Sequence, residues 1–523
     1  MDRQESLTAL QLSGQTWDIA IVGGGATGLG VAVDAASRGY RVCLLEQSDF
    51  AKGTSSRSTK IIHGGVRYLK QGNISLVRKA LRERAILLRN APHVVSQLPF
   101  ILPTFRWWES SYYSAGLKLY DFLARGDEFP VCRKLTGQEV VDAIPTIDAS
   151  RLYGGVQYWD GQFDDARLAI NLATTAVEQG AVLANYVRVT GLCKTESEIV
   201  CGLKWCDIET DRSWELLAKV VVNATGPFTD SLLQLDKPRP PIIAPSQGIH
   251  LVLDRSVLPS RQALMVPKTD DGRVLFAIPW RGVVVAGTTD TPVDAAGLEP
   301  KPKSEEVDFI LETLNRYLVE EVTSRHVLSV FAGIRPLVRG SGRGKTASIS
   351  RDHTLWSDTK SKLVTIAGGK WTTYRKMAEE TVDLAAQVAK LPARTCRTKT
   401  LDIHGKTQET PAVSRLSHYG SDSVIIERLT RETNGAQTVH AALDLTRAEI
   451  IFYCRREMAR TVDDVLARRS RALLLNAQAA IEAAPQVASI MAEELHLDDR
   501  WVVEQIATFS NIAENYVGHF PRK

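Results

Sequence analysis

The stretch WDIAIVGGGATGLGVAVDAASRGYRVCLLE (residues 17–46) constrains the fold more than any other part of the chain. It predicts a strand, a glycine-rich turn, a helix and a second strand, which is the order of a dinucleotide-binding βαβ unit. The turn has the spacing Gly-x-Gly-x-x-Gly, at Gly23, Gly25 and Gly28. These glycines permit a tight turn, a close approach of a pyrophosphate to the backbone, and close packing of the helix on its strand. The sequence therefore predicts a nucleotide-binding domain near the start of the chain.

The acidic residue that ends this unit narrows the choice of nucleotide. Glu46 follows the second predicted strand, about 20 residues beyond the glycines, where a carboxylate accepts both ribose hydroxyls and would repel a 2′-phosphate. The unit favours FAD or NAD over NADP, and by itself it leaves FAD and NAD both open. Because no second complete fingerprint follows, segments far downstream must complete the nucleotide site.

Length and composition are those of a globular protein and exclude wholesale disorder. The chain has 523 residues, of which 44% are hydrophobic and 24% charged, so it is long enough for about two or three domains. Its net charge of +4 is too small to indicate nucleic-acid binding, although it suits an anionic substrate or lipid surface. The seven cysteines show neither a CxxC pair nor zinc-ligand spacing. We therefore expect reduced thiols, no metal and a cytoplasmic location.

Any contact with a membrane is expected to be peripheral. The N-terminus is polar and carries acids, unlike a signal or transit peptide, and no apolar run reaches the ~18 residues of a membrane span. The best candidate for contact with a membrane surface is the segment 98–126, which mixes aromatic rings with cations. An aromatic patch in a substrate-binding domain explains the same residues equally well. The residues are Phe100, Phe105, Arg106, Trp107, Trp108, Tyr112, Tyr113, Lys118, Tyr120 and Arg125.

Strand patterns and glycine turns recur along the chain and indicate a discontinuous α/β fold. A strand is predicted at 182–189, and the segments 217–230 and 363–390 each predict a strand, a glycine turn and a helix. Alternating polar and β-branched residues over 242–291 predict a mixed or antiparallel sheet, which we expect to bind the substrate. From about residue 395 the pattern is mainly helical and predicts a separate C-terminal domain.

Seven motifs in ordered succession resemble those of the FAD-dependent glycerol-3-phosphate dehydrogenases, which belong to the D-amino-acid-oxidase-like flavoenzymes. The resemblance covers about residues 15–390, and the helical C-terminal region is similar to that family's C-terminal domain in a less specific way. The motifs are GGGATGLGVAVDAASRG, GTSSRSTKIIHGGVRYL, NATGPFTD, VAGTTDTP, FAGIRPLV, SRDHTL and IAGGKWTTYRKMAEETVD.

The resemblance implies an α/β protein with three parts. These are a discontinuous Rossmann-like FAD-binding domain, a substrate-binding domain on a mixed or antiparallel sheet, and a C-terminal helical domain. The oxidoreductase region is expected over residues 1–394 and the helical domain over 395–523. The FAD-binding parts are expected at about 15–97, 150–235 and 330–394, and the substrate-binding parts at about 98–149 and 236–329.

The implied activity is the oxidation of sn-glycerol 3-phosphate to dihydroxyacetone phosphate. Hydride would pass to flavin N5 and the electrons onward to a membrane quinone, with the protein peripheral on the inner face of the cytoplasmic membrane and possibly a homodimer. Two alternatives stay open, an oxygen-using glycerol-3-phosphate oxidase and a related FAD amine or amino-acid oxidase. A flavoprotein that modifies tRNA is a remote third, which the mild net charge disfavours.

The resemblance implies that cations from distant segments bind the substrate phosphate. They are Arg67 in KIIHGGVRYL, Arg335 in GIRPL and Lys370 in GGKWTTYR. Planar guanidinium groups and a mobile ammonium together suit a dianionic phosphate. The two arginines could instead pair with carboxylates, and Lys370 could contact the N1–C2=O region of the flavin. Tyr68 and Thr289 are expected to hydrogen-bond the substrate.

A base must take the proton of the substrate hydroxyl. His63, in KIIHGGVRYL, is implied as this base or as its partner beside the flavin. It could instead be a hydrogen-bonded structural histidine, and His250 in SQGIHLVL is the second candidate. Lys370 completes the predicted catalytic set.

For FAD, the resemblance implies contacts to the pyrophosphate and ribose from the first unit, to adenine from the backbone of Val187, and to the pyrimidine edge of the flavin from the GGKWTT motif. Small residues suit the last of these, because a backbone N–H reaches a flat ring only where no Cβ intervenes. Ordinary turn chemistry is the simpler alternative for the serines and threonines. The predicted cofactor-binding residues are Gly23, Gly25, Gly28, Glu46, Thr54, Ser55, Ser58, Val187, Gly226, Gly368, Gly369, Thr372 and Thr373.

The C-terminal segment 448–480 is amphipathic and rich in arginine. Such a stripe most often forms a solvated helical face with ion pairs, which is the interpretation favoured here. Dimer packing and lipid contact are the alternatives. The arginines are Arg455, Arg456, Arg460, Arg468, Arg469 and Arg471.

Overall fold

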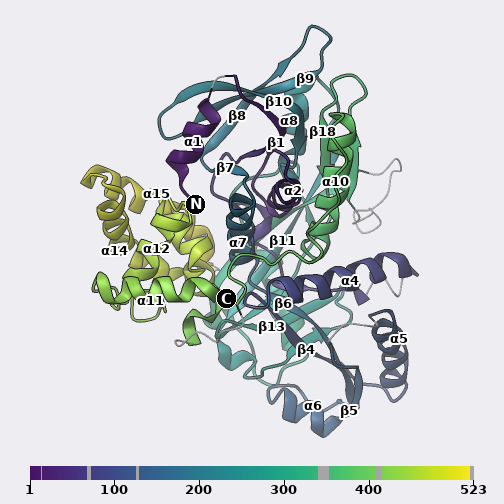
Figure 1. Ribbon diagram of the computed structural model, residues 1–523. Coiled ribbons are helices and arrows are strands. Elements are labelled where there is room, and N and C mark those ends of the chain that lie inside the picture. The colour runs from purple at the N-terminus through teal and green to yellow at the C-terminus, as the bar shows by residue number, and fades with distance from the viewer. Residues whose placement is uncertain (13, 67–71, 125–128, 340–352, 408–413, 519–523) are drawn as a thin grey trace.

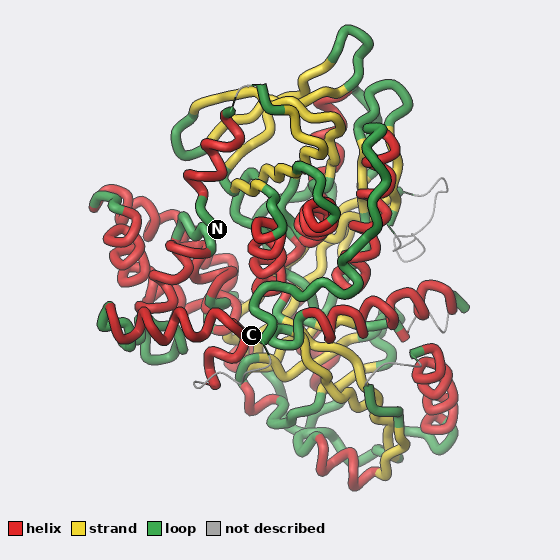
Figure 2. The backbone as a smooth tube through the Cα atoms, viewed as in Figure 1, coloured by secondary structure: helices red, strands yellow, loops and turns green. Residues whose placement is uncertain are grey.

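The computed structural model describes residues 1–523 except 13, 67–71, 125–128, 340–352, 408–413 and 519–523. Its strands form two sheets, and a group of helices from the C-terminal part of the chain packs beside them (Figure 1). Figure 2 shows the same division, with the C-terminal group of helices at one side and strands flanked by further helices in the rest of the molecule. The predicted α/β class with a helical C-terminal region is confirmed.

The first sheet has a parallel centre built on the glycine-rich unit. An antiparallel strand adds to one edge, and an antiparallel hairpin continues from the long strand β10. The parallel order is β18 (Val364–Ala367), β10 (Arg212–Asn223), β1 (Thr16–Val22), β2 (Val42–Leu45) and β7 (Val182–Ala184). The added strands are β17 (Thr354–Ser357), β8 (Val187–Lys194) and β9 (Val200–Asp207).

Both faces of this sheet are covered by helices. Successive residues of β1 point to opposite sides of the sheet, and those on each side are packed in a different cluster. Ile19 and Ile21 pack in the cluster formed with α2, α7 and α10, while Ala20 and Val22 pack toward α1 and α8. Gly30 lets α2 approach α10, since a Cβ there would lie 2.9 Å from the Tyr374 ring. The helices are α1 (Arg3–Gln11), α2 (Ala26–Ser37), α7 (Asp165–Glu178), α8 (Thr229–Asp236) and α10 (Tyr374–Val388).

The second sheet is antiparallel except where β12 runs parallel to β4, as the predicted mixed sheet requires. Helices α6 (Gly137–Ala143) and α9 (Ser304–Asn315) cover one face. The order is β15 (Thr291–Pro292), β11 (Ile243–Leu253), β14 (Val283–Gly287), β13 (Leu275–Trp280), β12 (Ala263–Val266), β4 (Val95–Thr104), β6 (Gly154–Phe163) and β3 (Ile61–Ile62). Two further strands join it, β16 (Val327–Val338) on β11 and β5 (Arg133–Thr136) on β6.

The aromatic segment 98–126 divides into a buried and an exposed part. Its first residues belong to β4, where Phe100 is 1% exposed and stacks on Tyr158. The rest leads into α5 (Glu109–Leu123), which follows α4 (Ile74–Asn90) and lies at the outer edge of the molecule, on the side opposite the C-terminal helices (Figure 1). Around α5, Trp107 is 73% and Phe122 54% exposed. No helix among the described ranges is long and apolar enough to span a bilayer.

The C-terminal helices pack around a core that also includes residues of the second sheet, such as Val285 and Phe331. Their arginines differ from the sequence-based interpretation. A solvated face is wrong for Arg468, Arg469 and Arg471, which are at most 2% exposed. The three lie in or just after a π-helical turn, Asp464–Arg469, and find carboxylate partners in distant parts of the chain. The helices are α11 (Ser423–Glu432), α12 (Arg447–Arg456), α13 (Ala472–Leu475), α14 (Ala477–Leu495) and α15 (Asp499–Val517).

Candidate active site

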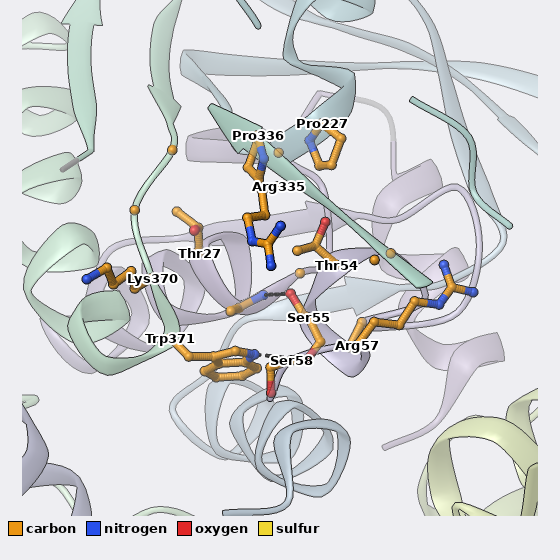
Figure 3. A pocket seen from close by; sticks show the side chains of 18 of the residues that line it. Thr27, Thr54, Ser55, Arg57, Ser58, Pro227, Arg335, Pro336, Lys370 and Trp371 are labelled. Carbon is orange, nitrogen blue, oxygen red and sulfur yellow. Dashed lines mark hydrogen bonds between the residues drawn. The ribbon is translucent and has the colours of Figure 1, made fainter. Parts of the chain in front are cut away.

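One cavity of about 640 Å³ lies between the two sheets. At one end it is lined by Gly23, Glu46 and Val187 of the nucleotide-binding unit, and at the other by His250 and Arg335 of the second sheet. Its volume lies in the range of cofactor and ligand sites, roughly 300–1,000 Å³. The cavity thus joins the predicted nucleotide site to the predicted substrate site (Figure 3).

The glycine turn leaves room for a phosphate group because its backbone is packed too closely for side chains. Gly23 has φ +108°, and a Cβ there would lie 2.7 Å from the Ala224 carbonyl oxygen. A Cβ on Gly28 would lie 1.8 Å from the Gly23 carbonyl oxygen. Gly25 is the N-cap of α2, and its own side-chain position is open to the cavity apart from Ser55. The positive end of the α2 dipole therefore faces the cavity, as an anionic pyrophosphate requires.

Glu46 is held in position by two backbone donors. The N–H of Gly24 donates to one carboxylate oxygen at 2.6 Å, and the N–H of Ser48 donates to the other at 2.8 Å. Burial raises the pKa of Glu46, and these two hydrogen bonds act in the opposite direction. Each oxygen keeps further acceptor capacity for a ribose hydroxyl. The geometry fits the predicted ribose contact.

Three of the hydroxyl residues predicted at the cofactor, Thr54, Ser55 and Ser58, line the cavity and also have partners within the protein. Thr54 donates to the Ile334 carbonyl at 2.5 Å, and Ser55 accepts from the Ala26 N–H at 2.9 Å. Ser58 donates to the Asp165 carboxylate at 2.7 Å. These bonds tie the loop after β2 to the start of α2, to β16 and to α7.

Val187 and Gly226 lie at the nucleotide end of the cavity. The Val187 N–H donates to the Glu46 carbonyl at 2.8 Å. This N–H therefore already has a partner within the protein, and the predicted backbone contact of Val187 with adenine stays a prediction. Gly226 has φ +57°, and a Cβ there would meet no atom within 4 Å, so its contact with the cofactor stays a prediction.

The GGKWTT motif follows β18 and reaches the cavity from the opposite side. Gly368 and Gly369 have φ of +76° and +85°, and a Cβ on Gly369 would lie 2.4 Å from the Met377 side chain. Thr372 accepts a hydrogen bond from the His63 N–H at 3.3 Å. Thr373 donates to the Lys370 carbonyl, also at 3.3 Å. The structure therefore places His63 against this motif, as the proposed flavin-side position requires.

Arg335 is fixed by the residues around it. Its guanidinium donates to the Thr288 hydroxyl at 2.8 Å and to the Asp290 carboxylate at 3.2 Å. A Cβ on Gly248 of the neighbouring strand would lie 2.4 Å from its Nη2. In Figure 3 the guanidinium points toward Thr54, while the Lys370 ammonium is directed away from it. Both cations line the same cavity.

His250 is buried and held neutral. Its Nε2 makes a 2.9 Å hydrogen bond with the Thr59 hydroxyl, and its ring stacks on Phe331 with 4.9 Å between ring centroids. Burial first, and then the positive charges of Arg335 and Lys60, hold the pKa of His250 well below its usual value. A neutral imidazole at physiological pH can accept a proton, but this environment makes it a weak base.

The remaining predicted substrate residues have mixed outcomes. Arg67 and Tyr68 lie outside the described residues. Thr289 lines the cavity, but its hydroxyl accepts from the Ile249 N–H at 3.0 Å and donates to Glu306 at 2.9 Å. Its predicted bond to the substrate stays a prediction.

Several supporting residues could not be recognised from the sequence. Thr288 and Asp290 hold Arg335, and the only sequence signal for them is their place in the GTTD motif. Tyr120 and Asp160 hold the backbone beside His63. The sequence marks Tyr120 only as part of the aromatic segment 98–126 and gives no signal for Asp160.

The fold and the site define an FAD-dependent oxidoreductase: the glycine turn, the fixed Glu46 carboxylate and the long cavity fit a dinucleotide whose far end reaches the second sheet. The family described as FAD dependent oxidoreductase matches residues 18–375, and the C-terminal domain of alpha-glycerophosphate oxidase matches residues 359–501. This chain belongs to that oxidoreductase family and, within it, to the glycerol-3-phosphate dehydrogenases.

The similarity to individual proteins extends over nearly the whole chain. The mitochondrial glycerol-3-phosphate dehydrogenase of Homo sapiens is 39% identical over 543 residues, which cover 97% of this chain and 74% of the relative. A probable mitochondrial glycerol-3-phosphate dehydrogenase of Caenorhabditis elegans is 40% identical, with 97% of this chain and 75% of the relative covered. The solved glycerol-3-phosphate dehydrogenase of Bacillus halodurans, complexed with FAD, has a TM-score of 0.82 and 30% identity and covers 100% of this chain and 99% of that one.

Proposed function

We propose that this protein oxidises sn-glycerol 3-phosphate to dihydroxyacetone phosphate with bound FAD. The observation that carries the proposal is the single cavity that joins the nucleotide-binding glycine turn to Arg335 and the two candidate histidines. FAD, when bound, supplies the hydride acceptor. The protein's own residues bind the phosphate, orient the alcohol and take its hydroxyl proton.

Arg335 is the proposed anchor of the substrate phosphate. A planar guanidinium offers paired donors to a phosphate, and Thr288 and Asp290 fix its plane before the substrate arrives. Its side chain is 24% exposed, so it is accessible from the cavity. Lys370 remains a second cation for either the phosphate or the flavin edge, and Arg67 remains a predicted third.

His63 is the proposed base and His250 its alternative. Both line the cavity. The environment of His250, buried and hydrogen-bonded to Thr59, suits a residue that orients the substrate hydroxyl better than one that holds a proton. His63→Asn should therefore reduce kcat more than His250→Asn does, and the reverse order would assign the base to His250.

We further propose that the electrons pass to a quinone at the cytoplasmic face of a membrane, which α5 contacts. Support comes from the exposed rings of Trp107 and Phe122 beside the exposed cations Arg106 and Lys118. Rings at the depth of the headgroups and cations on lipid phosphates are the pattern of an interfacial segment. Flotation with anionic vesicles tests this: Trp107→Ser with Phe122→Ser should release the protein, whereas the exposed Val503→Ser on α15 should not.

The reaction and its acceptor are tested on one preparation. Anaerobic glycerol 3-phosphate should bleach the yellow flavin, and a quinone analogue should restore its colour faster than oxygen does. Rapid recovery with oxygen and release of hydrogen peroxide would assign an oxidase instead, and no bleaching would reject the proposed substrate. The predicted homodimer is checked separately by sedimentation of the same preparation.

A further inference from the structure

The loop between β2 and β3, residues 46–60, is called the flavin loop here because it lines the nucleotide side of the cavity. Its regular structure is a single short turn, Thr54–Ser56. Two of its non-glycine residues, Ala51 and Lys60, have φ of 61° and 63°. Such backbone conformations cost energy and persist only where the surroundings fix them. The question is therefore what holds this loop.

The first half of the loop is held by the arginine segment, residues 457–471 of the C-terminal helical region. Asp49 is fully buried and accepts two hydrogen bonds from the Arg469 guanidinium, at 2.6 and 2.9 Å, and another from Arg468. Burial alone would raise the pKa of Asp49, but Arg469 and Arg468 outweigh it and lower the pKa. Lys52 pairs with Asp463 of the same segment at 3.0 Å.

The second half of the loop is held by Arg471 and α15. Arg471 donates to the Ser56 carbonyl and to the Asp165 carboxylate, both at 2.9 Å. The other oxygen of Asp165 accepts from the Ser58 hydroxyl, one of the predicted cofactor ligands. Arg471 has φ +68°, so this contact also depends on a strained residue. Arg57 donates to the Tyr516 hydroxyl of α15 at 3.1 Å.

The contacts between the arginine segment and the flavin loop are made by buried charged groups. Packing between two domains rarely needs such groups. Arg468, Arg469 and Arg471 are 2%, 0% and 0% exposed. A buried ion pair adds little net stability compared with apolar residues, but it fixes geometry because each charge must keep its partner. The acidic partners of these arginines are Asp49, which belongs to the loop, and Asp165, which lies beside it. A helical region that only covered the oxidoreductase would not need buried charges directed at this loop.

We propose that the arginine segment is a positioning device for the cofactor: it holds the flavin loop in the conformation that binds FAD, so that the C-terminal region sets how long FAD stays bound. Asp49, Arg469 and Arg471 are positioning residues, since they act through Glu46, Ser55 and Ser58 on the loop. The inference rests on the proposed function only through FAD and is independent of the substrate.

The test measures FAD release from the holoenzyme after dilution, by the fluorescence that free FAD regains. Arg469→Met should speed release about tenfold or more, because it removes two of the hydrogen bonds that orient Asp49. Lys52→Met removes the ion pairs of Lys52 with Asp463 and Glu299, and Tyr516→Phe removes the hydroxyl that contacts Arg57 and Glu299. Each of these milder changes should speed release about threefold. Arg455→Gln is the matched control: it breaks a surface pair with Glu494 in the same helical region and should leave release unchanged.

A second readout separates positioning from general loss of structure. With saturating FAD, thermal unfolding of Lys52→Met and Tyr516→Phe should stay within about 2 °C of the unaltered protein. If Arg469→Met does not fold, these two milder variants decide. Release rates equal to those of Arg455→Gln in both would overturn the inference, and so would faster release that merely follows a matching fall in unfolding temperature. Neither result would affect the proposed substrate, because glycerol 3-phosphate is absent from the experiment.

Discussion

The hydroxyl of Tyr120 accepts a hydrogen bond from the backbone N–H of Gly64 at 2.7 Å, one residue after His63. The same hydroxyl donates to the Asp160 carboxylate, which also forms an ion pair with the Arg84 guanidinium at 2.6 Å. A Cβ on Gly64 would lie 2.6 Å from the Tyr120 hydroxyl, so this close approach leaves no room for a side chain at position 64. Because Tyr120 belongs to α5, the helix that carries the exposed aromatic residues is joined directly to the backbone beside the proposed base.

Tyr120→Phe should therefore lower kcat without releasing FAD. The substitution leaves the buried Gly64 N–H without its acceptor, at a cost of about 1–3 kcal/mol, which displaces the His63 backbone. We expect a roughly tenfold fall in kcat, with a smaller change in KM. Steady-state kinetics with an artificial electron acceptor measure it. Tyr112→Phe, on the exposed face of α5, is the control, and equal kcat values for the two variants would contradict the positioning role of Tyr120.

Arg335→Ala should raise KM for glycerol 3-phosphate while the purified protein stays yellow. Loss of a charge-assisted contact to the phosphate is expected to raise KM by about 10²-fold. Arg335→Lys should recover only part of the affinity, because an ammonium cannot reproduce the planar pair of donors that Thr288 and Asp290 orient. Arg316→Ala, which breaks an exposed pair with Asp270, is the control. A colourless Arg335→Ala protein would instead place this residue at the cofactor.

The nucleotide-binding unit could be predicted from the sequence because its information is local: strand, glycines, helix and acid lie within residues 17–46. The burial of the C-terminal arginines could not, because it depends on partners such as Asp165 and Asp49, which lie 306 and 420 residues upstream of Arg471 and Arg469. Arginine spacing alone fits a surface helix equally well. Likewise, the aromatic segment 98–126 could not be divided from its composition, since the boundary between β4 and α5 decides which rings are buried.

Gly28→Ala should abolish FAD binding. The added Cβ would lie 1.8 Å from the Gly23 carbonyl oxygen, and the turn must open to relieve the clash. We expect protein that purifies colourless, without the visible absorbance of bound flavin. Gly116→Ala in α5 is the control, because a Cβ there meets no atom within 4 Å. Normal flavin content in Gly28→Ala would show that the close packing of α2 on the turn is not needed.

His404 should make the stability of the protein fall as the pH rises above neutrality. Burial alone would lower the pKa of His404, but hydrogen bonds to Asp422 and Glu178, at 2.8 and 2.7 Å, outweigh it and raise the pKa to about 10. Because the pKa of His404 is higher in the folded protein than the unfolded value of 6.5, the protonated imidazole stabilises the fold. This stabilisation is fully present below pH 6.5 and is lost as the pH rises toward 10.

The comparison of His404→Gln with the unaltered protein isolates this contribution. At pH 6 the substitution should cost about 2–4 kcal/mol of unfolding free energy, because it removes an imidazolium that links α7 to the C-terminal region. Between pH 6.5 and 10 the difference between the two proteins should shrink steadily. Denaturant unfolding at several pH values measures it. A difference that stays constant across this range would mean that His404 contributes through packing and not through its charge.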